Sequence, residues 1–333
     1  MRLRWGIIPG LLFLLLAASC QGGTAMVSPT VPGSPAEPGS PTVPGSPTYP
    51  PEWVRQPVFA GRFYTADAQE LETEIDSYMA GKEPTTGRTL ALIVPHAGYM
   101  YSGPVSGYAY ADVRGQSYDA VILIGQNHYL QDFSGVAVYP GGAWRTPLGL
   151  VPVDQELAQA ILQANPAFES DPARHSQDHC LEVQLPFLQR ALPGTPIVPI
   201  LIGYPDPQNA QALIEALAQV LPGRNVLLIA SSDLSHYPTY DQAVRVDRST
   251  LAAIETMDPL QLRQTVREEM SAGVPNLLTT CCGEEAIVVV MEVARRLGAD
   301  QATVLHYANS GDIPGGDRSK VVGYGAVRIW ATR

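Results

Sequence analysis

Val226-Leu-Leu-Ile-Ala-Ser-Ser-Asp-Leu-Ser-His236 is an apolar run that ends in a polar cluster and a histidine. Leu92-Ile-Val-Pro-His96 and Val121-Ile-Leu-Ile-Gly-Gln-Asn-His128 have the same form. Such short apolar runs, bounded by Gly, Pro or Asn, are typical of strands buried on both faces of a parallel sheet. Ligands of open α/β sheets bind at the carboxyl ends of these strands. Three of the six histidines therefore follow predicted strands, which predicts one shared site.

Helix-like and strand-like segments alternate from Trp53 onward. The alternation predicts a single α/β domain with a central, mainly parallel or mixed sheet flanked by helices. Residues 131–152 lack a helical period and predict a small antiparallel excursion or a lid. The predicted strands are 90–94, 120–124, 197–202, 226–230, 303–307 and 321–330, and the predicted helices are 67–79, 104–113, 154–164, 181–192, 208–220, 240–256, 259–271 and 283–297.

The first twenty residues have the features of a secretory signal. A basic start, Met1-Arg-Leu-Arg-Trp5, precedes an apolar stretch over residues 6–18. That stretch is shorter than the roughly 20 residues that span a bilayer, but it suits a signal peptide. Cys20 follows Ala17-Ala18-Ser19, which resembles a bacterial lipoprotein signal in which Cys20 is lipidated after cleavage. A plain signal peptide cut nearby, which gives a secreted protein, is the alternative.

Residues 21–52 are rich in Pro, Gly, Ser and Thr, and Thr-Val-Pro-Gly-Ser-Pro occurs at both 30–35 and 42–47. This composition predicts a disordered tether, because it cannot bury enough apolar surface to fold. The domain organisation is thus a lipoprotein signal at 1–20, a tether at 21–52 and a folded domain at 53–333. We expect the domain to lie outside the cytoplasm, held at the bacterial cell membrane by the lipid anchor only.

Charge and cysteine content restrict the function further. A net charge of −11 and a pI near 5.0 argue against binding to nucleic acid. Besides Cys20, the chain has Cys180, Cys281 and Cys282, an odd number, so a disulfide framework is not expected. A liganding or reactive thiol is the alternative. The role of Cys180, and whether Cys281 and Cys282 form a vicinal disulfide on oxidation, stay open.

Cys282 lies at the start of the predicted helix 283–297, with Thr280 or Cys281 at its cap. The positive end of a helix dipole lowers the pKa of a thiol, so this position predicts the thiolate that a metal ion requires. A buried apolar role is the other interpretation, and it applies mainly to Cys281. Among the remaining histidines, His175 and His306 are interpreted as structural or surface residues. His179 has acidic and thiol neighbours, and its role stays open.

Several motifs occur in a fixed order along the chain: Pro95-His-Ala-Gly-Tyr99, Gly125-Gln-Asn-His128, Arg145-Thr-Pro147, Glu182 with Leu185-Pro186, Ser231-Ser-Asp-Leu-Ser-His236 and Cys282-Gly283. Over residues 56–329 the chain resembles the Memo family, also called AmmeMemoRadiSam system protein B. That family is related in fold to class III extradiol dioxygenases, which hold non-haem iron with two histidines and a carboxylate.

The resemblance implies that His96, His128 and Cys282 are metal ligands, with the cysteine in place of the carboxylate. It also implies an acid/base role for His236 with Asp233. A thiolate favours copper or thiolate-ligated iron, with zinc as a third option, and dioxygenase activity does not follow from the fold. The chain departs from the family pattern at Phe59 and Tyr129, where histidines are often found.

Three hypotheses follow. The leading one is an extracytoplasmic protein that binds copper or iron, with or without redox activity. The second is a non-haem-iron oxygenase-like or hydrolytic enzyme that acts on a small molecule, with His236 as general acid/base. The third is a non-catalytic module that binds a peptide or a metabolite.

Overall fold

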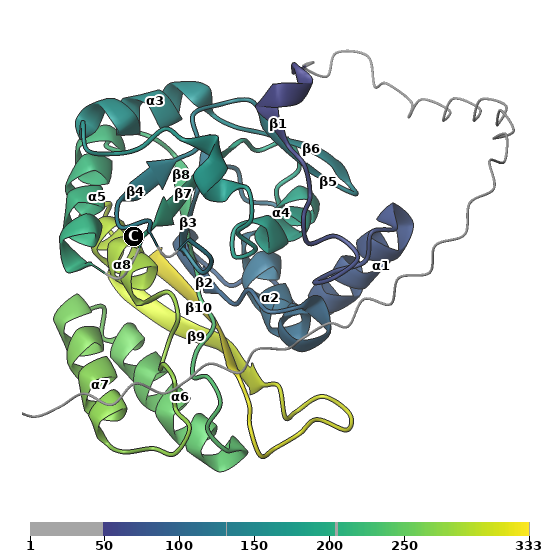
Figure 1. Cartoon of the computed structure of the whole chain (residues 1–333), viewed down its shortest axis with the longest axis vertical. Helices are drawn as coiled ribbons and strands as arrows, with labels where there is room; N and C mark the ends of the chain where they lie inside the picture. The colour runs from purple at the N-terminus through teal and green to yellow at the C-terminus, as the bar shows by residue number, and fades with distance from the viewer. Residues whose placement is uncertain (1–48, 131, 204–205, 333) are drawn as a thin grey trace, which may run out of the picture. The chain divides into compact units, whose positions relative to one another are not determined.

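The central sheet has seven strands in the order β4-β7-β3-β8-β2-β10-β9 (Figure 1). The structure is a computed structural model that describes residues 49–130, 132–203 and 206–332. In sheet order the strands are β4 (Val136–Val138), β7 (Ile197–Ile202), β3 (Ala120–Gln126), β8 (Val226–Ser231), β2 (Arg88–Val94), β10 (Gly323–Ala331) and β9 (Gln301–Asn309).

The four strands at the middle of this sheet, β7, β3, β8 and β2, are parallel to one another, whereas β4, β10 and β9 pair antiparallel. Every residue of β3, β7 and β8 is buried, because helices cover both faces of the sheet. This burial explains why these runs are continuously apolar rather than alternating. The predicted α/β domain with a mainly parallel, mixed sheet is confirmed.

Two groups of helices cover the sheet. On one face lie α1 (Ala68–Met79), α2 (Tyr99–Val113) and α4 (Leu185–Ala191). On the other lie α3 (Gln155–Ala164), α5 (Pro207–Val220) and α8 (Glu284–Arg296), together with α6 (Tyr240–Glu255) and α7 (Pro259–Ser271). In Figure 1, α6 and α7 lie side by side near β9. None of the helices among the described residues has the length and apolar character of a membrane span.

The segment predicted as an antiparallel excursion contributes to two sheets. Its first strand, β4, forms the edge of the central sheet. Its second and third, β5 (Ala143–Thr146) and β6 (Gly149–Pro152), form a hairpin that pairs with β1 (Val54–Arg55). Three short 3-10 helices complete the described secondary structure, at Pro51–Trp53, Pro172–His175 and Glu182–Gln184. The predicted signal peptide, Cys20 and the tether up to residue 48 lie outside the described residues.

Two helices differ from the sequence prediction. Helix α2 begins at Tyr99 rather than 104 and includes Pro104 in its second turn. It packs so closely on α1 that a Cβ at Gly103 or Gly107 would overlap Tyr78. The helix predicted over 181–192 is divided into a 3-10 turn at Glu182–Gln184 and α4, with a proline at the start of α4.

A buried carboxylate, Asp247 on α6, joins three distant segments. Its Oδ1 accepts the Ser235 N–H at 2.8 Å, and its Oδ2 accepts the Tyr307 hydroxyl at 2.8 Å. A Cβ at Gly323 would overlap this carboxylate, so the position requires glycine. Burial raises the pKa of Asp247 to about 6, and the hydrogen bonds from Ser235 and Tyr307 oppose the rise. Ionisation of Asp247 therefore costs stability.

We predict that the stability of Asp247→Asn relative to wild type increases as the pH rises. A carboxyl whose pKa is about 6 in the folded chain and about 3.9 in the unfolded chain stabilises the fold below about pH 4. That contribution is lost as the pH rises through about 6, and about 2 pKa units correspond to about 3 kcal/mol. The difference in free energy of unfolding, variant minus wild type, should therefore increase by about 3 kcal/mol between about pH 4 and pH 8 in urea titrations.

Asp241→Asn, at an exposed position on the same helix, is the matched control. A difference between Asp247→Asn and wild type that does not change with pH would show that this carboxyl titrates normally.

Candidate metal centre

The histidine-bearing strand ends meet at one edge of the sheet. Strand β8 lies between β3 and β2 and is parallel to both. His96 follows β2, His128 follows β3, and the loop to His236 follows β8. The topology thus brings together the segments that the sequence pattern indicated.

Three side chains present ligand atoms to one another. His96 Nε2 lies 3.2 Å from Cys282 Sγ, and one ligand atom from each of His96, His128 and Cys282 falls within 4.8 Å of the others. The His96 and His128 rings are 4.9 Å apart and nearly perpendicular, at 81°. Two imidazole nitrogens and one sulfur form a set that binds transition metals. These residues could therefore hold a metal ion.

Asp233 holds two of the three liganding segments in place. Its Oδ1 accepts the backbone N–H of His96 at 2.7 Å, and its carbonyl accepts the backbone N–H of Cys282 at 3.2 Å. The loops that carry Asp233 and Cys282 run beside each other, because His236 N–H donates to the Thr279 carbonyl at 3.1 Å. Asp233 thus has a structural role, whatever part it plays in proton transfer.

Burial shifts the pKa of His96 and that of Asp233 in opposite directions. Desolvation lowers the pKa of His96 well below its ordinary value, and neighbouring His128 adds to the effect. The ring is therefore neutral, which is the form that binds metal ions. Burial raises the pKa of Asp233, while the nearby His236 acts in the opposite direction.

The expected effect of the helix start on Cys282 is wrong. Helix α8 begins at Glu284 with Gly283 as its N-cap, so neither Thr280 nor Cys281 caps it and Cys282 precedes it. Burial, followed by the charge of Asp233, raises the pKa of the Cys282 thiol well above its ordinary value. Without a metal ion the thiol is protonated, and a bound cation would have to displace that proton.

His236 lies at the border of this cluster and is partly buried. Its Nδ1 is 2.9 Å from the Leu234 carbonyl, which only accepts hydrogen bonds, so Nδ1 carries the hydrogen and Nε2 is unprotonated in the neutral ring. His236 is close enough to influence the titration of both His96 and Asp233. An imidazole with this tautomer can accept a proton at Nε2.

The structure adds His179, whose role the sequence left open. Its ring centroid lies 5.1 Å from that of His96 and 5.0 Å from that of His128. Burial, then the neighbouring His96, lowers its pKa to about 3, and its buried Nδ1 has no hydrogen-bond partner among the described residues. The signal in the sequence was its position between an aspartate and a cysteine just before a helix.

Asp178 contacts both the ring and the backbone of His128. Its Oδ2 lies 3.8 Å from His128 Nδ1 and accepts the His128 backbone N–H at 3.3 Å. Burial favours the neutral carboxyl, but the interactions with His128 prevail and hold the pKa of Asp178 below its usual range. Carboxylates in this position orient liganding histidines. His128, Asp178 and Cys180 also have ligand atoms within 4.8 Å, but the Cys180 thiol is buried against the Gln126 carbonyl at 3.6 Å.

The two departures from the family pattern lie against each other. The rings of Phe59 and Tyr129 stack with centroids 6.1 Å apart, and each also contacts His179, at 5.6 and 5.5 Å. Phe63 completes this aromatic cluster at 4.8 Å from His179. At both positions this chain therefore places an aromatic ring beside His179.

Buried Glu182 fixes the segment that carries these aromatic residues. Its carboxylate accepts the backbone N–H groups of Val58 and Phe59 and the Tyr64 hydroxyl, at 2.7–3.1 Å. It also pairs with Arg55 at 2.6 Å. The Arg55 guanidinium donates in turn to the Asp178 carbonyl at 2.9 Å, which ties the N-terminal segment to the loop that carries His179.

The remaining two histidines, His175 and His306, are interpreted from the sequence as structural or surface residues. His175 is fully buried beside Trp144 and Tyr139, with ring centroids 5.9 and 5.4 Å away. His306 on β9 stacks on Tyr108 at 4.2 Å. Neither belongs to the described groups of potential metal ligands.

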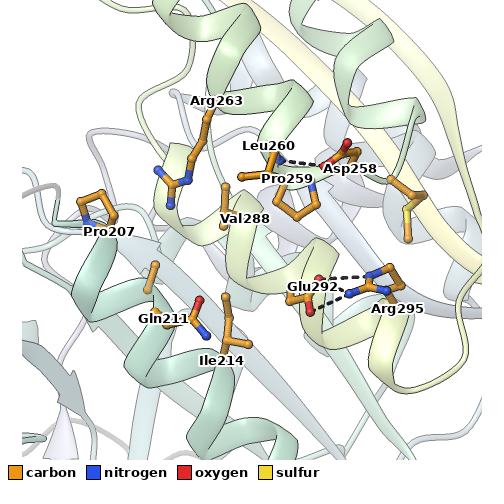
Figure 2. Close-up of a pocket in the computed structure, with 12 residues that line it drawn as sticks. Pro207, Gln211, Ile214, Asp258, Pro259, Leu260, Arg263, Val288, Glu292 and Arg295 are labelled. Atoms are coloured by element: carbon orange, nitrogen blue, oxygen red, sulfur yellow. Dashed lines mark hydrogen bonds and ion pairs between the residues drawn. The ribbon is translucent and has the colours of Figure 1, made fainter.

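A separate cleft of about 490 Å³ lies between α5, α7 and α8 (Figure 2). Pro207, Ile214, Leu260 and Val288 give it an apolar lining, and Glu292 pairs with Arg295 at its edge. The residues that line the cleft include none of the candidate metal ligands or their hydrogen-bonded supports. The cleft is therefore distinct from the candidate metal centre.

The fold and the site define an α/β protein with a candidate two-histidine, one-cysteine metal centre near the carboxyl ends of the parallel strands of a mixed sheet. The family model described as Memo-like protein matches residues 55–328. The chain belongs to the Memo family.

Relatives with the name MEMO1 family protein share about a third of their residues with this chain. That of Nitrosopumilus maritimus is 36% identical over 283 residues, which cover 83% of this chain and 99% of the relative. That of Methanothermobacter thermautotrophicus is 34% identical over 281 residues, covering 81% and 98%. An uncharacterised Escherichia coli K12 protein of known structure aligns with a TM-score of 0.47 and 13% identity, over 73% of this chain and 100% of its own.

Proposed function

We propose that this Memo-family chain binds copper or iron through His96 Nε2, an imidazole nitrogen of His128 and the Cys282 sulfur. The observation that carries the proposal is the convergence of these three ligand atoms within 4.8 Å. Borderline imidazole and soft thiolate ligands suit Cu(I) and thiolate-ligated iron, and Zn(II) is a third ion that the same set accepts. Three protein ligands leave coordination positions free for a small molecule.

Redox activity at this centre would require a group that handles protons, and we assign that role to His236. Its Nε2 carries no hydrogen in the neutral ring, because Nδ1 donates to the Leu234 carbonyl. Asp233 lies close enough to interact electrostatically with this ring, because the nearby His236 opposes the burial-driven rise in the pKa of Asp233. The bound metal would supply the electron-transfer chemistry, and His236 would move the accompanying proton.

The adjacent residues Cys281 and Cys282 allow a test of metal binding with a matched control. We predict that the full chain retains about one equivalent of Cu(I) or Fe(II) under reducing conditions, and that Cys282→Ala or His96→Ala weakens binding by more than about 100-fold. Cys281→Ala is the matched control, because the Cys281 thiol is buried and is not among the potential ligands. His236→Gln should also retain the metal. Metal content after desalting and competition with a chromophoric chelator provide the readouts.

A wild-type chain that retains no copper, iron or zinc would contradict the proposed function. Equal losses in Cys281→Ala and Cys282→Ala would also contradict it, because they would indicate a general effect of thiol removal. Metal retention without oxygen consumption or turnover of small molecules would favour a binding role over an enzyme.

We further propose that the domain lies outside the cytoplasm as a lipoprotein. The support is the basic and apolar start, the small residues before Cys20 and the Pro/Gly/Ser-rich stretch that follows. The family model begins at residue 55, so this leader precedes the region shared with the family.

Cys20→Ser is predicted to remove lipidation and to shift the protein from the membrane pellet to the soluble or secreted fraction in a bacterial host. Fractionation after incorporation of a labelled fatty acid measures this directly, with Cys180→Ser as the control thiol. Equal labelling of wild type and Cys20→Ser would rule out the assignment.

A further inference from the structure

A chain of buried hydrogen bonds lies behind His96, on the side away from Cys282. His96 Nδ1 is 3.0 Å from Ser231 Oγ, while Nε2 of the same ring faces Cys282 Sγ at 3.2 Å. Ser231 Oγ also lies 2.6 Å from the Cys180 carbonyl and 3.0 Å from Gln184 Nε2. His96, Ser231 and Gln184 are each at most 2% exposed. Their hydrogen bonds are therefore formed within the protein.

The orientation of the Gln184 amide follows from its neighbours. Gln184 Nε2 lies 2.9 Å from the Pro95 carbonyl, which can only accept, so this end of the side chain is the NH₂ group. The other end, Oε1, accepts the Tyr110 hydroxyl at 2.7 Å. The two amide hydrogens are thus donated to Pro95 and to Ser231 Oγ.

The hydrogens around Ser231 can then be counted. A serine hydroxyl has one hydrogen, and at Ser231 it is donated to the Cys180 carbonyl, which only accepts. One lone pair of Oγ accepts from Gln184, and one lone pair remains for His96. The hydrogen between His96 Nδ1 and Ser231 Oγ must therefore come from His96.

We infer that Ser231, oriented by Gln184, is a positioning residue that fixes His96 as the Nδ1–H tautomer. In this tautomer Nε2 carries no hydrogen, so its lone pair is directed towards Cys282 and is free to bind a metal ion. The other tautomer would place a hydrogen on Nε2, where the metal should bind, and would leave Nδ1 and Ser231 Oγ without a hydrogen between them. The role of this tautomer in metal binding rests on the proposed function, but the tautomer itself is a property of the metal-free chain.

The loop after β8 offers a matched control for Ser231. Ser235 is equally buried, and its hydroxyl forms none of the hydrogen bonds that His96, Ser231 and Gln184 make. Ser235→Ala therefore removes a buried hydroxyl without altering the hydrogen bonds of His96. Ser231→Thr keeps an acceptor hydroxyl beside Nδ1 and serves as the conservative rescue.

The tautomer can be read from long-range ¹H–¹⁵N correlations of the imidazole rings in the full, metal-free chain. We expect the Nδ1–H pattern for His96 in wild type, Ser235→Ala and Ser231→Thr, and a population of the Nε2–H form in Ser231→Ala. For Zn(II), used as the probe, Ser231→Ala should bind about 10–100-fold more weakly, while the other two variants bind like wild type.

An Nε2–H pattern for His96 in the wild-type spectrum would overturn the inference, whether or not any variant folds. A Ser231→Ala chain with the Nδ1–H pattern and wild-type Zn(II) affinity would overturn it as well. If the wild type shows the Nδ1–H pattern but binds no Zn(II), copper or iron, the proposed function fails while the tautomer assignment stands.

Discussion

The two hydrogen bonds that Asp233 accepts from the main chain are the constraint on which the candidate metal centre depends. Its carboxylate binds the N–H of His96 at the end of β2, and its carbonyl binds the N–H of Cys282 before α8. One residue thereby sets the distance between a ligand that follows a strand and a ligand that precedes a helix. Because β8 lies between β2 and β3, the same loop is also beside the strand that leads to His128. Backbone contacts of this kind place liganding side chains before any metal binds, which reduces the ordering required on binding.

The protonation states of Cys282 and His96 determine how a metal ion can bind at this centre. Burial and Asp233 hold the pKa of the Cys282 thiol well above its ordinary value, and burial and His128 hold the pKa of His96 well below its own. The metal-free centre is therefore a neutral thiol facing a neutral imidazole, and no buried ionic pair has to be stabilised there. A cation that binds must release the thiol proton, so its affinity increases with pH below the pKa of the thiol. The positive charge that makes the thiolate favourable comes from the ion and not from the helix dipole.

The apolar periodicity of the chain predicts the sheet, and the positions of the histidines after apolar runs predict where His96, His128 and the loop to His236 lie, because both depend on local pattern and strand order. The sequence also predicts Cys282 as a ligand, from the family resemblance and from the helix start, and burial reverses the pKa shift expected from the helix start. His179 was not assigned a place, because its approach to the liganding rings depends on a loop that Arg55 holds from 123 residues away. Long-range hydrogen bonds of this kind have no local signature. For the same reason the sequence does not predict that the strands within residues 136–152 join two different sheets, since this depends on pairing with β7 and β1.

The identity of the atoms around a bound ion is the central claim of this account. An X-ray absorption spectrum of the full chain loaded with one equivalent of Zn(II) measures it directly. We predict one sulfur at about 2.3 Å from the zinc, together with imidazole nitrogens at about 2.0 Å. A shell of nitrogen and oxygen alone, or one with two or more sulfurs, would contradict it.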